Sequence, residues 1–91
     1  MKKTGIELIA AERERQIKEE GWTPEHDAQH TGDELARAAV CYALPDRIPD
    51  TIPLVWPWAE EWFKPTPGDR IRELTKAGAL IAAEIDRLQN Q

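Results

Sequence analysis

Apolar residues recur at helical spacing in three stretches of the chain and predict helices at about residues 5–20, 32–43 and 67–89. A short turn of helix is expected at about 58–63. No stretch alternates apolar and polar residues, as a strand with one buried face would. The sequence therefore predicts an all-α domain: a small bundle of three to four helices, with a long Pro/Trp-rich loop between the second and the last long helix.

The first predicted helix is marked at both ends. Thr4 and Glu7 spell a capping box at its start, and Gly21 supplies its stop. Its inward-facing positions are expected to be Ile6, Ile9, Ala10 and Ile17. The charged residues of mixed sign predict a solvent-exposed face with a Glu14–Lys18 pair one turn apart. This charged face comprises Glu12, Arg13, Glu14, Arg15, Lys18, Glu19 and Glu20.

The second predicted helix follows a polar connector that runs from Trp22 to His30. A capping box of Thr31 and Glu34 predicts its start, and Pro45 follows its end. Its inward-facing positions are expected to be Leu35, Ala38, Ala39 and Tyr42, with Cys41 serving the packing.

The segment between residues 44 and 65 contains five prolines and cannot form a long helix. Three indoles lie within it, at Trp56, Trp58 and Trp62. Loops of more than about 12 to 15 residues are commonly functional or disordered, and this aromatic content argues against disorder. We expect one of the three rings to be structural and at least one to face a cavity.

The last predicted helix begins around Thr66, Pro67 and Asp69, with proline at the favoured first position. Gly78 indicates a close backbone approach, most simply against the alanine-rich second helix. One face is expected to carry Ile71, Leu74, Ala77, Gly78, Ile81, Ile85 and Leu88.

Size and charge narrow the possible functions. The 91 residues suffice for one domain, and the net charge of −5 argues against binding to nucleic acid. No apolar run approaches the length of a membrane span, and the start of the chain does not resemble a secretion signal. With a single cysteine, the chain can form no internal disulfide, which favours a reducing compartment and a cytoplasmic location.

The tryptophans suggest a binding site. Rigid indole faces bind flat ligands, and the cationic residues nearby favour a ligand that is also anionic. Arg70 and Arg72 stand at a helix start, where positive charge is unfavourable unless an anion or an acidic neighbour such as Asp69 or Glu73 compensates it. The full set of candidate ligand-binding residues is Trp22, His30, Arg37, Trp56, Trp58, Trp62, Lys64, Arg70 and Arg72, and Arg47 is a further cation near the loop.

The sequence gives less support to an enzymatic function. The E-x-x-E and E-x-x-D pairs of MazG-like nucleotide pyrophosphohydrolases do not occur in the chain, and the absence of serine excludes serine triads. His26, Asp27 and His30 have weak metal-ligand spacing and resemble part of an HD phosphohydrolase motif. We therefore expect no resident metal or cofactor, and no catalytic residue is assigned.

Several short motifs together resemble a family of small proteins encoded by phages and prophages. They are Glu20-Gly21-Trp22-Thr23, His30, residues 34–39, Tyr42-Ala43, Trp56-Pro57-Trp58, Lys64-Pro65 and residues 72–81. The order of Gly-Trp, Asp, His, Leu and Tyr before Asp69-Arg70 is also remotely similar to ryanodine-receptor repeat domains. That second resemblance implies a helical module that recognises nucleotide-derived ligands.

These observations predict a non-enzymatic protein that binds and sequesters a nucleotide-derived small molecule, such as an ADP-ribose-type or cyclic immune signal. A phage would gain from such a protein as a countermeasure in the host cytoplasm, and the protein could be a homo-oligomer. The alternatives are a small helical nucleotide hydrolase, a protein-protein inhibitor that uses the Trp-rich loop, and a plain structural module.

Overall fold

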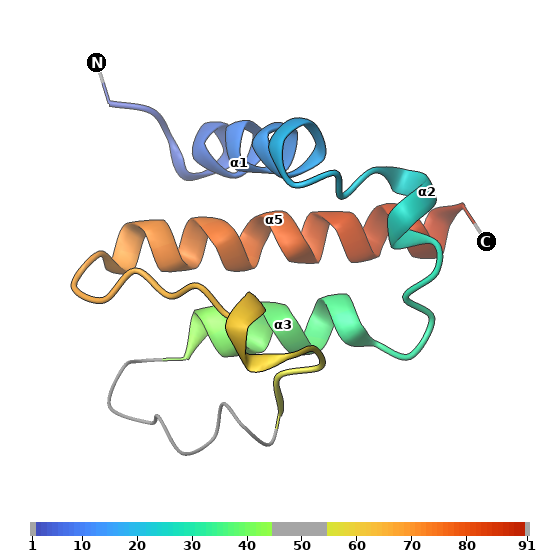
Figure 1. Cartoon of the computed structure of the whole chain (residues 1–91). Helices are drawn as coiled ribbons and strands as arrows, with labels where there is room; N and C mark the ends of the chain where they lie inside the picture. The colour runs from blue at the N-terminus through green and yellow to red at the C-terminus, as the bar shows by residue number, and fades with distance from the viewer. Residues whose placement is uncertain (1, 45–54, 91) are drawn as a thin grey trace.

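The computed structural model describes residues 2–44 and 55–90, and within these ranges the protein is all-α and contains no strand (Figure 1). Residues 45–54, which include Arg47 and the first part of the predicted loop, lie outside the described residues. The elements are α1 (Gly5–Glu19), α2 (Pro24–Asp27), α3 (Glu34–Ala43), the 3₁₀ helix η2 (Glu60–Trp62) and α5 (Arg70–Gln89).

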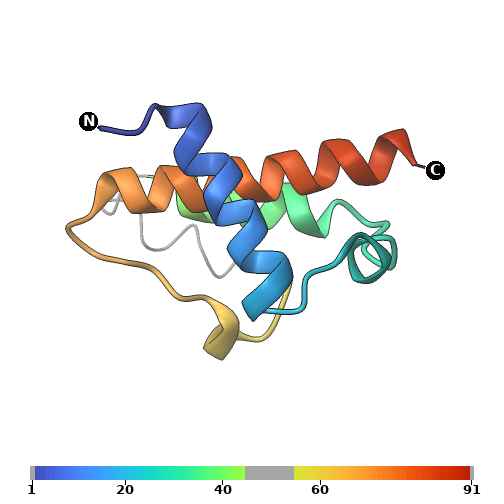
Figure 2. The ribbon, with the colours of Figure 1, turned by 90° about the horizontal axis from the view of Figure 1, so that it is seen from above.

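The long helix α5 is the centre of the fold. α3 runs antiparallel along one side of it, and α1 crosses its other side, as Figures 1 and 2 show. The segment from residue 55 to residue 69 lies over one face of this arrangement. The molecule is flat, with principal extents of 39 × 36 × 20 Å.

The core lies mainly between α3 and α5. Small side chains let the two helices approach closely, and one large aliphatic side chain, Leu80, is almost fully buried between them. The predicted inward face of α3 is confirmed, since all of its residues and Cys41 are buried. The core comprises Leu35, Ala38, Ala39, Cys41, Tyr42, Trp56, Ala77, Leu80 and Ala83.

The capping box of α1 is confirmed: Glu7 N–H donates to Thr4 Oγ1 at 3.2 Å and Thr4 N–H to Glu7 Oε1 at 2.7 Å. The Glu14–Lys18 pair is also confirmed, at 2.7 Å. The prediction of a solvated charged face holds for Glu14, Lys18, Glu19 and Glu20, which are exposed, but was wrong for Glu12. The two buried residues of α1 are Glu12 and Gln16, on the side of the helix that packs toward α5.

The apolar positions predicted to face inward in α1 are not buried. Ile6 is 82% exposed and Ala10 is exposed, while Ile9 and Ile17 are half-buried. The helix was predicted correctly, but its buried positions are polar, and of the predicted apolar positions Ile9 lies against α5 at Gly78.

The predicted polar connector contains a helical turn that was not predicted. Thr23 Oγ1 accepts the N–H of His26 at 3.2 Å, and Pro24 occupies the first position of α2. The Thr-Pro pair is a typical start signal, but four residues are too short to show any periodicity.

α3 begins at Glu34 rather than at residue 32, and the predicted capping box does not form. Asp33 has a φ of 65°, and Glu34 Oε1 accepts the N–H of Gly32 at 2.5 Å. The Glu34 carboxylate therefore caps the turn in front of the helix, and Thr31 has no part in a box.

α5 begins at Arg70 rather than at residue 67. Asp69 caps the helix by accepting the N–H of Arg72 at 3.0 Å, while Pro67 and Gly68, with a φ of 84°, form the preceding turn. Because Gly68 adopts a left-handed conformation, the helix cannot extend back to Pro67.

The predicted apolar face of α5 is mostly outside. Ala77 is buried, but the large aliphatic residues Ile71, Leu74, Ile81, Ile85 and Leu88 are all exposed. Gly78 does permit a close approach, although not by α3: a Cβ there would lie 2.5 Å from Ile9 Cδ1. Gly78 is therefore where α1 crosses α5.

Within the described residues, no helix combines the length and the apolar content that crossing a bilayer requires.

Candidate ligand-binding cleft

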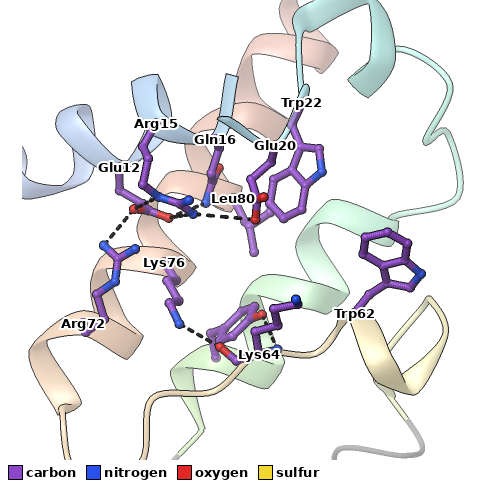
Figure 3. A pocket seen from close by; sticks show the side chains of 11 residues that line it. Glu12, Arg15, Gln16, Glu20, Trp22, Trp62, Lys64, Arg72, Lys76 and Leu80 are labelled. Atoms are coloured by element: carbon purple, nitrogen blue, oxygen red, sulfur yellow. Dashed lines mark hydrogen bonds and ion pairs between the residues drawn. The ribbon is translucent and has the colours of Figure 1, made fainter. Parts of the chain in front are cut away.

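Two adjoining hollows lie between the end of α1, α2 and the segment that carries the tryptophans. We call them the aromatic hollow, of about 420 Å³, and the charged hollow, of about 270 Å³. Glu20, Trp22 and Trp62 line both hollows, which therefore adjoin at these residues, and we call the two together the cleft. Figure 3 shows the side chains of the charged hollow. The aromatic hollow is also lined by His26, Asp27, His30, Leu35, Trp58 and Ala59, and the charged hollow by Glu12, Arg15, Gln16, Tyr42, Lys64, Arg72, Lys76 and Leu80.

Trp22 is held in the cleft by its backbone. Gly21, with a φ of 76°, turns the chain at the end of α1, so that Trp22 N–H donates to the Gln16 carbonyl at 3.1 Å. Arg13 donates to the Trp22 carbonyl at 3.1 Å and to the buried Asp27 carboxylate at 2.7 Å. One arginine thereby ties together α1, the Trp22 backbone and α2.

The wall of the aromatic hollow consists of rings in contact. Trp58 lies edge-on to His30, with centroids 5.3 Å apart, and 6.4 Å from Trp22 at a tilt. The His26 and His30 rings are 4.9 Å apart. Trp62 stands at the opening and is 61% exposed. These rings leave aromatic surface available to a ligand.

Trp56 is a core residue and does not line either hollow, which corrects its prediction as a ligand-binding residue. It is 8% exposed, its Nε1–H donates to the Ala59 carbonyl at 3.0 Å, and it packs edge-on against Tyr42 and Trp58. The expectation that one of the three loop tryptophans is structural and another faces a cavity is confirmed.

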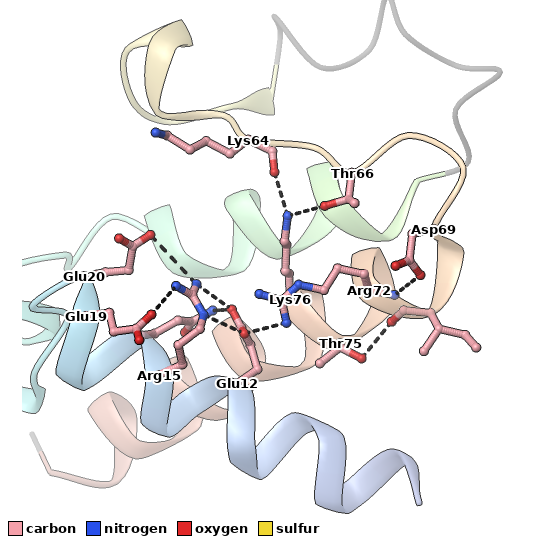
Figure 4. A network of polar contacts seen from close by, with 12 residues as sticks. Glu12, Arg15, Glu19, Glu20, Lys64, Thr66, Asp69, Arg72, Thr75 and Lys76 are labelled. Atoms are coloured by element: carbon pink, nitrogen blue, oxygen red, sulfur yellow. Dashed lines mark hydrogen bonds and ion pairs between the residues drawn. The ribbon is translucent and has the colours of Figure 1, made fainter. Parts of the chain in front are cut away.

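A buried carboxylate organises the charged hollow. Glu12 accepts two hydrogen bonds from Arg15, each 2.9 Å long, one from Arg72 at 2.7 Å and one from Gln16 Nε2 at 3.2 Å (Figure 4). Burial alone would raise the pKa of Glu12, but the hydrogen bonds from Arg15 and Arg72 outweigh it and hold this pKa below its ordinary value. The carboxylate therefore stays charged and positions both guanidinium groups.

Lys76 is a third fixed cation of the charged hollow. Its Nζ donates to the Lys64 carbonyl and to Thr66 Oγ1, both at 2.7 Å, and lies 5.4 Å from the centroid of the Tyr42 ring. Burial lowers the pKa of Lys76. Burial also raises the pKa of Tyr42, whose hydroxyl accepts the N–H of Lys64 at 3.1 Å.

Gln16 leaves an unused acceptor beside the charged hollow. Its Nε2 donates to Glu12, and its buried Oε1 has no hydrogen-bond partner among the described residues. Because Glu12 can only accept, the amide must point Nε2 toward it. The hydrogen-bond network therefore fixes the orientation of the amide and leaves its oxygen free to accept a hydrogen bond from a donor group of a ligand.

Besides Trp56, two further predicted site residues lie outside both hollows. Arg37 Nε donates to the Val55 carbonyl at 3.0 Å, and Arg70 donates to the carbonyls of Ala43 and Leu44 at the C-terminal end of α3. The compensating negative group expected for Arg70 is therefore the end of a helix dipole. Arg72 is compensated by Glu12 rather than by Asp69 or Glu73.

The weak metal candidates lie together but are not arranged as a metal site. The Asp27 carboxylate is engaged with Arg13, and His30 Nδ1 lies 3.5 Å from Glu34. In the described part of the chain, no group of three or more histidine, cysteine or carboxylate side chains is placed to hold a metal ion.

The structure thus brings together six of the nine predicted ligand-binding residues: Trp22, His30, Trp58, Trp62, Lys64 and Arg72. Sequence reasoning missed Arg15, Gln16 and Lys76: Arg15 was assigned to a solvated face, and no role was assigned to Gln16 or Lys76. Only the crossing of α1 over α5 brings these three polar side chains to one hollow, and no local motif records that crossing.

Comparisons of the chain with protein-family models, with curated proteins and with solved structures give no match.

Proposed function

We propose that the cleft binds a nucleotide-like small molecule, with a flat ring in the aromatic hollow and an anionic group in the charged hollow. The observation that supports this proposal best is that the two hollows adjoin, with Glu20, Trp22 and Trp62 lining both. A ligand that spans them would meet both kinds of surface at once.

The aromatic hollow suits a base. Its volume of about 420 Å³ lies within the range of small-molecule sites. Trp22, Trp58 and Trp62 offer indole faces, and stacking of a base on an aromatic side chain is worth about 1–3 kcal/mol. The lining residues include no lysine or arginine, so a neutral ring is favoured there over a phosphate.

The charged hollow suits an anion. Four cationic side chains line it, those of Arg15, Lys64, Arg72 and Lys76, against the two carboxylates of Glu12 and Glu20. Arg15 and Arg72 are already oriented by Glu12, and preorganised guanidinium groups recognise phosphate well. Positive charge therefore remains in excess beside the aromatic hollow.

In this proposal the protein binds the ligand and does not convert it. The protein would sequester the ligand, and its use as a phage countermeasure against an ADP-ribose-type or cyclic signal rests on the sequence resemblance. Hydrolysis is the competing outcome and would convert the ligand rather than retain it. A contact of the exposed Trp62 with a partner protein is the second candidate.

Calorimetric titration with ADP-ribose, AMP, ribose 5-phosphate and adenosine tests the proposal. We expect ADP-ribose or AMP to bind more tightly than either adenosine or ribose 5-phosphate, which each fill one hollow, and binding to weaken as salt rises. Chromatography of the same mixtures reports any hydrolysis, and native mass spectrometry of protein purified from cells reports a retained small molecule.

Two variants test the contributions of the two hollows to binding separately. Trp62→Ala removes an exposed ring and should weaken AMP binding by about 1–3 kcal/mol without unfolding the protein. Lys64→Ala should weaken AMP and ribose 5-phosphate but not adenosine. Lys18→Ala, on the exposed Glu14 pair, is the charge-matched control and should change nothing. Absence of binding by all four probes, with no retained mass, would refute the proposal.

A further inference from the structure

An apolar stripe on α5 faces away from the cleft. Leu74, Ile81, Ile85 and Leu88 are between 47% and 51% exposed, and their spacing places them along one side of the helix. Ile85 is nine residues from Lys76 of the charged hollow, which corresponds to about half a turn around the helix at roughly 100° per residue. The cleft and the stripe are therefore on opposite sides of α5.

The helices leave this side of the molecule uncovered. The described part of the segment between α3 and α5 lies over the opposite face, and on the stripe's side the first turns of α1 project beyond α5 (Figure 2). Ile6 in those turns is 82% exposed.

We propose that a second copy of this chain covers the stripe, with α5 packed antiparallel against α5 of the partner. A symmetric dimer requires a surface that complements itself. The stripe meets this requirement, because reversing α5 about the point between Ala79 and Leu80 superimposes its apolar positions on one another. In that register Leu74 lies opposite Ile85, Ile71 opposite Leu88, and Ile81 opposite Gly78.

The details of the stripe support this occupant. Gly78 is already covered by Ile9 of α1, so the contacts of the proposed interface are those of residues 71, 74, 85 and 88 on either side of it. No charged residue interrupts positions 71, 74, 78, 81, 85 and 88, as expected for the centre of an interface. Antiparallel packing also places the positive end of each helix dipole beside the negative end of the other.

The size of the contact sets its strength. Twenty residues of α5 extend for about 30 Å, and a contact between single helices belongs to the small end of specific interfaces. We therefore expect a weak dimer that dissociates at micromolar concentrations, independent of any ligand in the cleft.

Sedimentation equilibrium of the full chain across micromolar concentrations tests the dimer. Ile85→Glu should give a monomer at concentrations where the wild-type chain is dimeric. Val40→Glu is the matched control, because Val40 is 46% exposed on α3, outside the stripe, and this variant should remain dimeric. Circular dichroism should show that both variants are folded.

Cysteine cross-linking tests the orientation. Mixed Leu74→Cys and Ile85→Cys chains should form a disulfide-linked heterodimer under mild oxidation, and neither variant alone should cross-link as readily. In the proposed register, two copies of residue 74 are separated by about 16 Å along the axis. A wild-type chain that stays monomeric at about 200 μM, well above the expected dissociation constant, would overturn the proposal. Equal dissociation of Ile85→Glu and Val40→Glu, or cross-linking of residue 74 to itself, would also overturn it.

Discussion

Replacement of Glu12 by glutamine tests whether a buried carboxylate holds α1 on α5. The substitution keeps the shape of the side chain and removes its charge. Each Glu12 oxygen accepts from two donors, and glutamine keeps only one acceptor oxygen, so two of the four hydrogen bonds are replaced by contacts with an NH₂ group that can only donate. Arg15 and Arg72 also lose their negatively charged partner. A solvated carboxylate, as the sequence pattern had predicted, would tolerate this change with little loss of stability.

The expected loss of stability follows from how deeply Glu12 and its two arginine partners are buried. Removing one partner of a fully buried ion pair costs about 3–5 kcal/mol. The Glu12 side chain is only 1% exposed, but those of Arg15 and Arg72 are about one-third exposed and can recover part of their hydration. We therefore expect a loss of about 2–3 kcal/mol, which lowers the melting temperature of a domain of this size by about 10–20 °C.

Thermal and urea unfolding at neutral pH, followed by circular dichroism, measure this loss. Glu14→Gln is the control, because its carboxylate forms an exposed pair with Lys18 and should not affect stability measurably. The pKa of Glu12 is lowered in the folded state, so its contribution is complete above the ordinary value near 4.5 and is lost as the pH falls through the folded value. The wild-type chain should therefore lose more stability on acidification than Glu12→Gln does. Equal stability of the two glutamine variants would refute this account of the α1–α5 contact.

Three further predictions concern single contacts. Arg70→Gln should destabilise the fold by about 1 kcal/mol in urea unfolding and leave AMP binding unchanged, because the guanidinium binds carbonyls of α3 outside the cleft. Gly78→Ala should cost about 1 kcal/mol in the wild-type chain, since the new Cβ meets Ile9, and should stabilise an Ile9→Ala background, where only the gain in helix propensity remains. EDTA should change neither the melting temperature nor AMP binding; a large drop in either would restore the metal site at His26, Asp27 and His30.

The elements with strong local signals were predictable from the sequence. The capping box of α1, the inward face of α3 and the all-α class follow from caps and periodicity, which depend only on neighbouring residues. The starts of α3 and α5 were misplaced because Asp33 and Gly68 adopt left-handed conformations, which interrupt helical geometry just before each helix. A capping pattern cannot reveal that a nearby turn competes for the same carboxylate.

The aromatic half of the cleft was more predictable than its charged half. Trp22, Trp58 and Trp62 stand out as large rings in polar segments, whereas Arg15 and Lys76 look like ordinary surface charges of helices. Arg70 was misassigned because its anion is a set of backbone carbonyls, which every sequence contains. Cations that bind the backbone and cations that line a cleft cannot be distinguished until the helices are packed.

The charged hollow and the exposed stripe have a common origin in the way α5 distributes its charged and aliphatic side chains. The side of α5 that meets α1 near the cleft carries Arg72 and Lys76 rather than aliphatic residues, so the contact between the two helices is held partly by Glu12 and its arginines. Apart from the buried Leu80, the large aliphatic side chains of α5 are exposed. A binding cleft for an anion needs fixed cations, and here the buried Glu12 carboxylate fixes two of them. Because α5 presents these cations toward α1, its exposed aliphatic side chains are left for another surface, and the cleft and the proposed dimer face lie on opposite sides of α5.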